Sequence, residues 1–228
     1  MRWNRTGVIA GAIYVIVGLA CLLIARPTGP AWVVAAWLVL VAVVGAFVPG
    51  EANQVTLARA YLAAPAFVYA VAGQFGFLAL AVAIAGLSDL VDGTVARRFA
   101  QPSNLGGGLD PVVDGVFMGG LVIGLASGGT FPLWLALVVI ARYLLPAVGG
   151  GVLIAAGRRP ELRHTLTGQV STTLILVLVG GVCLFRGLHQ DSSGLLNAAE
   201  VVIPVATLAT YVHLAFASRR AAVSAEPG

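Results

Sequence analysis

The sequence has no lysine, few charges of either sign and only two cysteines. All thirteen basic residues are arginine, nine residues are acidic, and charged residues make up 10% of the 228. A soluble domain carries about 25% charged residues, so this composition excludes an ordinary soluble globular protein. Cys21 and Cys183 both lie within apolar runs, which argues against a disulfide framework. The scattered arginines form no basic patch, so we expect no nucleic-acid partner.

Long apolar runs fill most of the chain. Hydrophobic residues make up 59% of the sequence, and the mean hydropathy is +0.98. A membrane-spanning helix needs about 20 apolar residues, whereas a barrel strand has about 10 and alternates. Eight apolar runs are separated by breaks of glycine, proline or charge: Thr6–Ala25, Ala31–Val48, Val55–Val71, Gln74–Leu90, Pro111–Ala126, Phe131–Ala156, Thr165–Phe185 and Ala198–Ala217. The sequence therefore predicts an all-α integral membrane protein with about eight transmembrane helices.

The arginines predict how these helices are oriented. If the amino terminus lies inside, ten arginines fall at or near the cytoplasmic side, only Arg26 and Arg186 fall outside, and Arg142 lies within a span. Such an asymmetry is the positive-inside pattern of membrane proteins. We therefore expect a multi-pass protein of the cytoplasmic membrane.

Four aspartates lie within one otherwise apolar region: Asp89, Asp92, Asp110 and Asp114. A carboxylate in hydrocarbon costs about 2.5–3.5 kcal/mol, so a cluster of four requires neutralisation. The spacings of three and four residues place each pair on one helix face, and we expect a loop through Gly106–Gly108 to join the two helices. Carboxylates suit Mg²⁺ or Mn²⁺. The pattern predicts a site for one or two divalent ions, on the cytoplasmic face.

Residues beside the aspartates suit a phosphate-bearing ligand. Gly93 and Ala96 share the face of the first pair and let a ligand approach the helix backbone. Arg97 follows them and offers a planar fork that matches phosphate oxygens. Ser103 adds a hydroxyl from the connector. We interpret this combination as a pyrophosphate site.

The stretch from Asp89 to Asp114 reads D-x-x-D-G-x-x-A-R, eight residues, then G-x-x-x-D-x-x-x-D. It resembles the signature of the CDP-alcohol phosphotransferases at every fixed position. The resemblance implies a membrane enzyme with six core helices and a dinuclear Mg²⁺ or Mn²⁺ site. Such an enzyme transfers the phosphatidyl group of a CDP-linked lipid, such as CDP-diacylglycerol, to an alcohol and releases CMP, in phospholipid biosynthesis.

The resemblance also implies roles for single residues. The four aspartates hold the metals, and Asp114 also deprotonates the acceptor hydroxyl. Contacts with the CDP-lipid are implied for Gly93, Arg97 and Ser103. Upstream, Asn53, Thr56 and Arg59 form an N-x-x-T-x-x-R stretch that resembles the phosphatidylglycerophosphate and cardiolipin synthase branch, where Asn53 and Thr56 help to hold the cytidine end.

The acceptor is less well indicated by the sequence. Residues Gly168–Thr172 lie where that branch often shows G-K-x-K-T, and both lysines are absent. Arg142 and Arg163 are the cationic residues that we expect to contact an anionic acceptor instead. We favour glycerol 3-phosphate or phosphatidylglycerol, while inositol phosphate and other alcohols stay as alternatives.

The resemblance divides the chain into an extra amino-terminal transmembrane hairpin over residues 1–50, a membrane domain over 51–220 and a polar tail over 221–228. It also implies a homodimer surrounded by membrane lipids. A divalent-cation transporter is the alternative function for the same acids. However, the acids lie at helix ends on one side, and the sequence shows no internal repeat of the kind found in transporters.

Plainer interpretations compete with these roles. The aspartates would then be solvated helix-end charges, although that leaves their spacing unexplained. Asn53 and Thr56 would be ordinary helix-capping residues. Arg142 would pair with backbone or a lipid head group, and Arg163 would be a topology signal.

Overall fold

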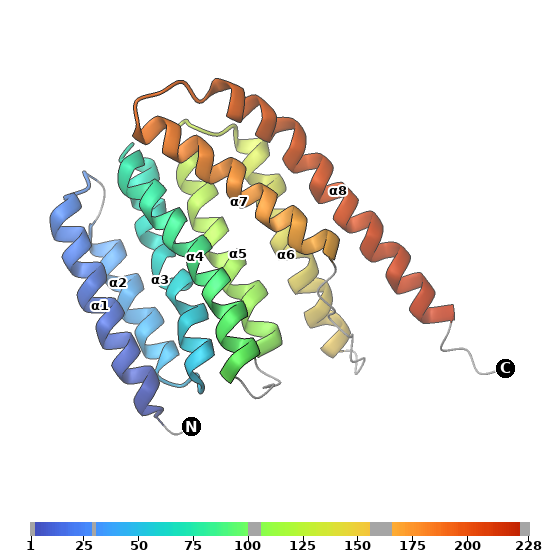
Figure 1. Ribbon diagram of the computed structural model, residues 1–228, viewed down its shortest axis with the longest axis horizontal. Coiled ribbons are helices and arrows are strands. Elements are labelled where there is room, and N and C mark those ends of the chain that lie inside the picture. The colour runs from blue at the N-terminus through green and yellow to red at the C-terminus, as the bar shows by residue number, and fades with distance from the viewer. Residues whose placement is uncertain (1–2, 29–30, 100–105, 156–165, 224–228) are drawn as a thin grey trace.

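The structure is a computed structural model that describes residues 3–28, 31–99, 106–155 and 166–223. These residues form eight α-helices and the turns between them (Figure 1). In chain order the helices are α1 (Arg5–Ala25), α2 (Ala31–Gly45), α3 (Glu51–Val71), α4 (Phe75–Phe99), α5 (Gly106–Ser127), α6 (Leu133–Ala155), α7 (Leu166–Gly187) and α8 (Ser193–Val223). The predicted all-α architecture is confirmed, and each apolar run corresponds to one helix.

Two boundaries near the aspartates were predicted wrongly. Helix α4 continues to Phe99, well beyond Leu90, and α5 begins at Gly106, so that Gly106–Gly108 are helical and are not part of a loop. Glycine has low helix propensity, so three glycines in succession are typical of a loop, but the helix that follows extends back through them.

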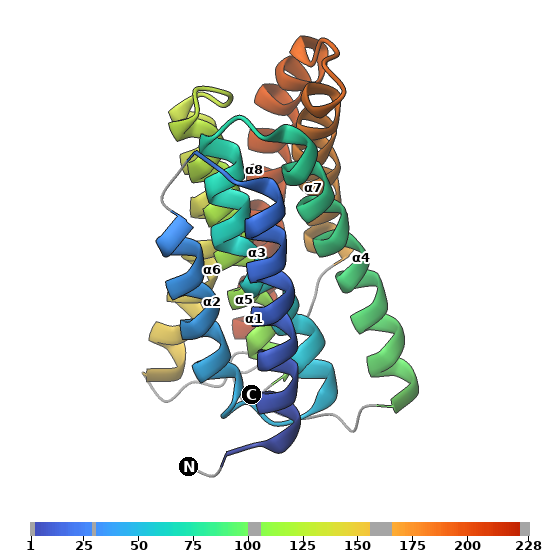
Figure 2. The same ribbon diagram turned by 90° about the vertical axis from the view of Figure 1, so that its left-hand side faces the viewer.

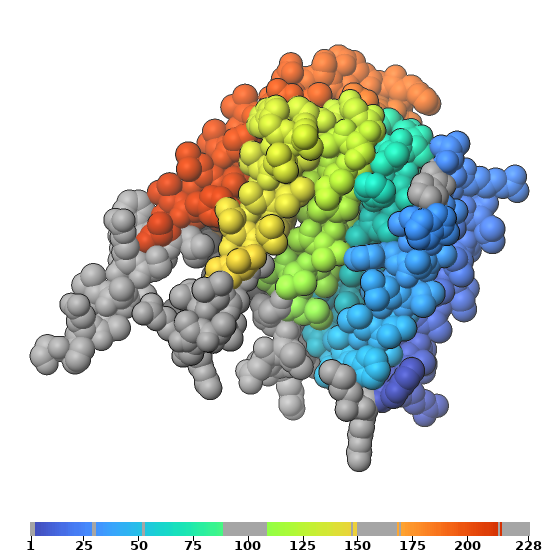
Figure 3. All heavy atoms as spheres, turned by 180° about the vertical axis from the view of Figure 1, so that it is seen from behind, coloured from blue at the N-terminus to red at the C-terminus, as the bar shows by residue number. Residues whose placement is uncertain are grey.

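The surface of the described residues is apolar along most helices. Large hydrophobic side chains are exposed on α1, α2, α6 and α8 in particular, and Figure 3 shows α5 and α6 at the surface between α2 and α8. Within the described parts of the chain, four segments are long and apolar enough to cross a membrane: Arg5–Ala25, Leu109–Ser127, Val170–Gly187 and Ser193–His213. An apolar exterior on spans of this length fits lipid contact. The chain is a multi-pass membrane protein.

Helix α3 has the largest number of neighbouring helices. It packs against α1, α2, α4 and α5, while α7 packs between α4 and α8, and α6 contacts α5 and α8 (Figures 1 and 2). Because α4 and α5 both contact α3, this helix links the two segments that carry the aspartates. The end of α3 that begins at Glu51 lies at the same end of the bundle as the start of α5 (Figure 1).

Glycines bring the backbones of α3 and α5 close together. A Cβ atom added at Gly120 or Gly124 would lie 2.7 Å from the carbonyl oxygen of Ala63 or Phe67, and a similar approach to α3 recurs at Gly128. These glycines are four residues apart and therefore lie on one face of α5. Small residues at this spacing let membrane helices pack backbone to backbone. The contact fixes the second half of α5 against α3.

The amino-terminal hairpin α1–α2 is attached to α3 through polar groups. The Trp37 indole N–H donates to the carbonyl of Ala60 at 2.7 Å, and the Tyr14 hydroxyl donates to the carbonyl of Gln54 at 3.3 Å. The Gln54 amide in turn donates to the carbonyl of Gly45 at 3.0 Å. Hydrogen bonds between membrane helices each contribute about 0.6–2 kcal/mol. The hairpin is therefore held against the half of α3 that begins at Glu51.

We predict that Gly124→Ala weakens the packing of α3 on α5. The added methyl group would meet backbone atoms of α3, which cannot move away without shifting the helix, so we expect a loss of about 1–3 kcal/mol in the free energy of unfolding. The matched control is Gly119→Ala, because a Cβ there meets nothing within 4 Å. Denaturant unfolding in detergent measures both variants, and equal stability of the two would contradict the close contact.

Candidate active site

Two of the predicted metal ligands lie near the start of α5. Asp110 and Asp114 are four residues apart, so their carboxylates project from the same face of the helix. The Asp114 side chain is 25% exposed and that of Asp110 is 43% exposed. Both acids are therefore accessible to a ligand while one edge of each is turned towards α3.

Arg59 of α3 meets both of these acids. Its Nη1 donates to Oδ1 of Asp114 at 2.5 Å, and its Nη2 lies 3.6 Å from Oδ1 of Asp110. Arg59 itself is only 4% exposed. Buried charges require a partner of opposite sign, and here one guanidinium serves two carboxylates. The ion pair holds the two acids towards a common point.

Arg59 was not among the predicted site residues, although the signal for it was present in the sequence. Arg59 is the last fixed residue of the N-x-x-T-x-x-R stretch, and a spacing of three places Asn53, Thr56 and Arg59 on one face of α3. All three side chains are buried. A buried cation requires a partner of opposite charge, and the neighbouring α5 supplies two acids.

Asn53 and Thr56 lie further towards the start of α3. The Asn53 amide donates to the carbonyl of Pro49 at 2.6 Å, so part of its side chain stabilises the turn that leads into the helix. Thr56 is 4% exposed and lies one turn before Arg59. The structure thus brings Arg59 together with the α5 acids, and Thr56 and Asn53 precede it along the same face of α3.

The other predicted site residues fall where side chains or whole residues are not described. Asp89, Asp92, Gly93 and Arg97 belong to helix α4, but their side chains lie outside the described part of the structure. Ser103 and Arg163 lie outside the described residues altogether. Their roles stay predictions from the sequence.

The described acids fit a divalent cation. Asp110 and Asp114 offer hard oxygen ligands of the type that Mg²⁺ and Mn²⁺ prefer, and both carboxylates already converge on a positive group, the Arg59 guanidinium. No group of three or more potential metal ligands occurs among the residues whose side chains are described. These two acids would therefore supply part of a metal site, and further ligands would come from elsewhere.

A second buried cation lies between α6, α7 and α8. Arg142 is 7% exposed, and it donates to the hydroxyl of Thr210 at 2.9 Å, the hydroxyl of Thr172 at 3.0 Å and the carbonyl of Gly168 at 3.1 Å. These partners are neutral. The Arg142 Nε and the Tyr143 hydroxyl are buried without a hydrogen-bond partner among the described groups. Arg142 thus joins three helices and keeps unused donor capacity.

Tyr143 connects this polar region to the acid pair. Its Cβ lies 3.2 Å from the position that a Cβ would occupy on Gly115, the residue after Asp114. The absence of a side chain at Gly115 lets α6 approach α5 at this point. The Arg142 region and the acid pair are therefore neighbours across the α5–α6 contact.

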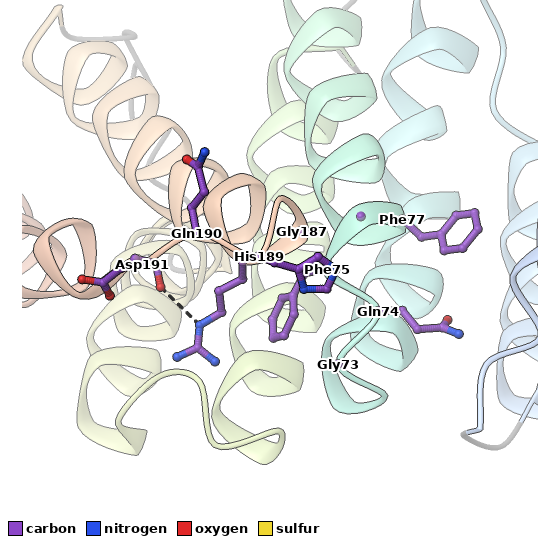
Figure 4. Close-up of a pocket in the computed structure, with 11 residues that line it drawn as sticks. Gly73, Gln74, Phe75, Phe77, Gly187, His189, Gln190 and Asp191 are labelled. Carbon is purple, nitrogen blue, oxygen red and sulfur yellow. Dashed lines mark hydrogen bonds between the residues drawn. The ribbon is translucent and has the colours of Figure 1, made fainter.

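The cavity shown in Figure 4 lies at the other end of the bundle. It is formed by the α3–α4 and α7–α8 turns. Arg186 donates to the hydroxyls of Ser192 and Thr130, each at 3.3 Å, and lies over the Phe75 ring. It thereby connects three turns. This cavity is distant from the acid pair, and we assign Arg186 a structural role.

Comparison with known proteins identifies the family. The sequence model for CDP-alcohol phosphatidyltransferase matches residues 51–216, which is more than half of the chain. The chain belongs to this family. The match begins at the first residue of α3 and extends into α8. Within this phosphatidyltransferase domain lie Arg59, both α5 acids and Arg142, whereas α1 and α2 precede the match.

Individual relatives show which branches of the family the chain is similar to. It is 38% identical over 145 residues, 56% of this chain and 45% of the relative, to a probable cardiolipin synthase (CMP-forming) of Drosophila melanogaster. It is 40% identical over 97 residues, 42% of this chain and 45% of the relative, to the cardiolipin synthase (CMP-forming) of Streptomyces coelicolor. The chain thus spans less than half the length of these two relatives.

A third relative is covered more fully. The CDP-diacylglycerol–glycerol-3-phosphate 3-phosphatidyltransferase of Mycoplasma genitalium is 28% identical over 167 residues, 64% of this chain and 70% of that protein. The relatives therefore include cardiolipin synthases and a CDP-diacylglycerol–glycerol-3-phosphate 3-phosphatidyltransferase.

We predict that Arg59 is coupled more strongly to Asp114 than to Asp110. The Asp114 contact is short and more buried, whereas the Asp110 contact is longer and half-exposed. A double-mutant cycle of Arg59→Gln with Asp114→Asn should give a coupling of about 2–3 kcal/mol, and the cycle with Asp110→Asn about 1 kcal/mol or less. Denaturant unfolding in EDTA provides the values. A reversed order of the two couplings would contradict this arrangement of the site.

Proposed function

We propose that this chain transfers the phosphatidyl group of CDP-diacylglycerol to an alcohol acceptor and releases CMP. The observation that carries the proposal is the pair Asp110 and Asp114, which lies at fixed positions of the family signature and converges on the buried cation of Arg59. The family match supplies the reaction class. Its relatives include a cardiolipin synthase (CMP-forming) and a CDP-diacylglycerol–glycerol-3-phosphate 3-phosphatidyltransferase, which supports phospholipid synthesis as the role.

The reaction requires one bond to form and one to break. The acceptor oxygen bonds to the phosphorus of the phosphatidyl group, the bond from that phosphorus to the bridging oxygen of the diphosphate breaks, and CMP departs with the electron pair. Asp114 accepts the hydroxyl proton of the acceptor. Bound Mg²⁺ or Mn²⁺ would offset the negative charge that develops on the departing CMP.

The remaining residues position the substrate in this proposal. Asp89 and Asp92 on α4 would hold metal together with the α5 acids, so that four carboxylates would bind two ions. Gly93, Arg97 and Ser103 would contact the diphosphate and lipid, and the α3 face would hold the cytidine end. Holding both reactants in line contributes much of the rate in such transfers.

We also propose that the acceptor carries a phosphate group, as glycerol 3-phosphate and phosphatidylglycerol both do. Arg142 is a buried cation with neutral described partners and an unused Nε, and it neighbours the acid pair through Tyr143. A buried positive charge of this kind favours an anionic ligand. Arg163 would add a second cationic contact. The arginine distribution would place the site on the cytoplasmic side of the membrane.

CMP release by the purified protein tests the proposed reaction. With CDP-diacylglycerol, Mg²⁺ and a panel of alcohols, we expect CMP with glycerol 3-phosphate or phosphatidylglycerol, loss of activity in EDTA and recovery with Mg²⁺ or Mn²⁺. Asp114→Asn should lower kcat by about 10³-fold, because the proton acceptor is lost, while CDP-diacylglycerol still binds. Full turnover by this variant, or CMP release that is unaffected by EDTA, would contradict the proposal.

The role of Arg142 is tested by acceptor kinetics. Arg142→Gln should raise the KM for the phosphate-bearing acceptor by about 10–100-fold, the loss expected for a hydrogen bond to a charged group, with little effect on the KM for CDP-diacylglycerol. Tyr211→Phe is the matched control, because the Tyr211 hydroxyl joins α8 to α6 through the carbonyl of Ala141 at 2.7 Å. Equal effects of the two substitutions would show that Arg142 only supports packing.

A further inference from the structure

Arg59 occupies the point on which the α5 acids converge. Two nitrogens of its guanidinium face Oδ1 of Asp114 at 2.5 Å and Oδ1 of Asp110 at 3.6 Å. A divalent ion that used oxygens of both acids would have to bind close to this group. Because arginine stays protonated in proteins, the positive charge persists when a metal arrives.

The packing around Arg59 restricts how far its guanidinium group can move away from the two acids. The side chain is almost fully buried, and the helix that carries it is held against α5 by the glycine contacts at Gly120 and Gly124. On the other side of α3, the Trp37 indole N–H donates a hydrogen bond to the carbonyl of Ala60, the residue that follows Arg59. The backbone at Arg59 is therefore fixed between α2 and α5, and the guanidinium stays within reach of both acids.

We propose that Arg59 is an internal counter-ion that competes with the divalent metal for Asp110 and Asp114. This inference rests on the proposed function, because it assumes that these acids bind metal. In the metal-free protein Arg59 keeps the two carboxylates together and limits their mutual repulsion. With metal present, its charge opposes binding, so that the site holds metal most firmly when the negatively charged diphosphate of the substrate is also bound.

The expected size of the effect is large enough to measure. Even with the dielectric constant of water, a unit charge about 5 Å from a divalent ion lowers the affinity for that ion roughly tenfold. A residue with a purely structural role would have the opposite effect, since its loss would disturb the acids and weaken metal binding. The direction of the change therefore separates the two roles.

The experiment measures Mn²⁺ binding by electron paramagnetic resonance on the purified full chain in detergent, without nucleotide. Arg59→Gln and Arg59→Met should each raise the Mn²⁺ affinity by about tenfold. Arg59→Lys keeps the charge and should stay within about threefold of the unsubstituted chain. The matched control is Arg186→Gln, which removes the same charge at the opposite end of the bundle and should leave the affinity unchanged.

A second readout uses thermal unfolding. A ligand stabilises the folded state according to its affinity, so saturating Mn²⁺ should raise the Tm of both neutral Arg59 variants by more than it raises that of the unsubstituted chain. If a neutral variant folds only when Mn²⁺ is present, the same measurement still applies. Such a variant would show a cooperative thermal transition with Mn²⁺ and none without it, which is the largest possible stabilisation by the metal.

Two outcomes would overturn the inference, and they have different meanings. If the unsubstituted chain binds Mn²⁺ and releases CMP, but the neutral variants bind Mn²⁺ equally or more weakly, Arg59 is not a competing counter-ion and the proposed function stands. If the unsubstituted chain binds no Mn²⁺ and its CMP release is insensitive to EDTA, the metal site itself is wrong and both proposals fail.

Discussion

The close contact between α3 and α5 is the constraint on which the rest of the structure depends. Glycines at four-residue intervals let the two backbones meet without side chains between them. This contact places a buried arginine of one helix against two acids of the other. Without it, Arg59 would not meet these two acids, and the acids would have no fixed direction. The packing of α3 on α5 thus also determines how these charges are arranged.

Neighbouring helices hold α3 in its position against α5. Helix α3 is held from the other side by the hairpin, through hydrogen bonds from Tyr14 and Trp37 to its backbone. It also contacts α4, which carries the second pair of signature aspartates. The hairpin lies outside the family match, yet it supports the helix on which the charged centre is built. This gives the additional segment a physical connection to the site.

Much of the fold follows from the sequence because membrane helices are encoded by continuous apolar runs. Glycine breaks between apolar runs also marked helix ends, and Gly73 and Gly129 adopt positive φ in two of these breaks. The start of α5 could not be predicted from the sequence, because Gly106–Gly108 are typical of loops and are helical only in the context of the helix that follows. Local propensity is a weak guide at such a helix end, because tertiary context overrides it.

The candidate site was predictable in part. Aspartate spacing indicated the acid pair on α5, but it could not show that Arg59 lies opposite, since that depends on how α3 packs against α5. The glycine spacing on α5 was visible in the sequence, although nothing in it named the partner helix. Likewise, Arg142 was recognised as an unusual charge within a span, while its contacts with α7 and α8 required the structure.

The central claim is that the α3–α5 contact presents two carboxylates to a divalent cation. The most direct measurement is a crystal structure of the full chain with Mn²⁺ and CDP-diacylglycerol, in which anomalous scattering locates the metal. The account predicts Mn²⁺ about 2 Å from carboxylate oxygens of Asp110 and Asp114, with Arg59 beside them. Mn²⁺ bound elsewhere, or the two acids turned away from each other and from the diphosphate, would contradict it.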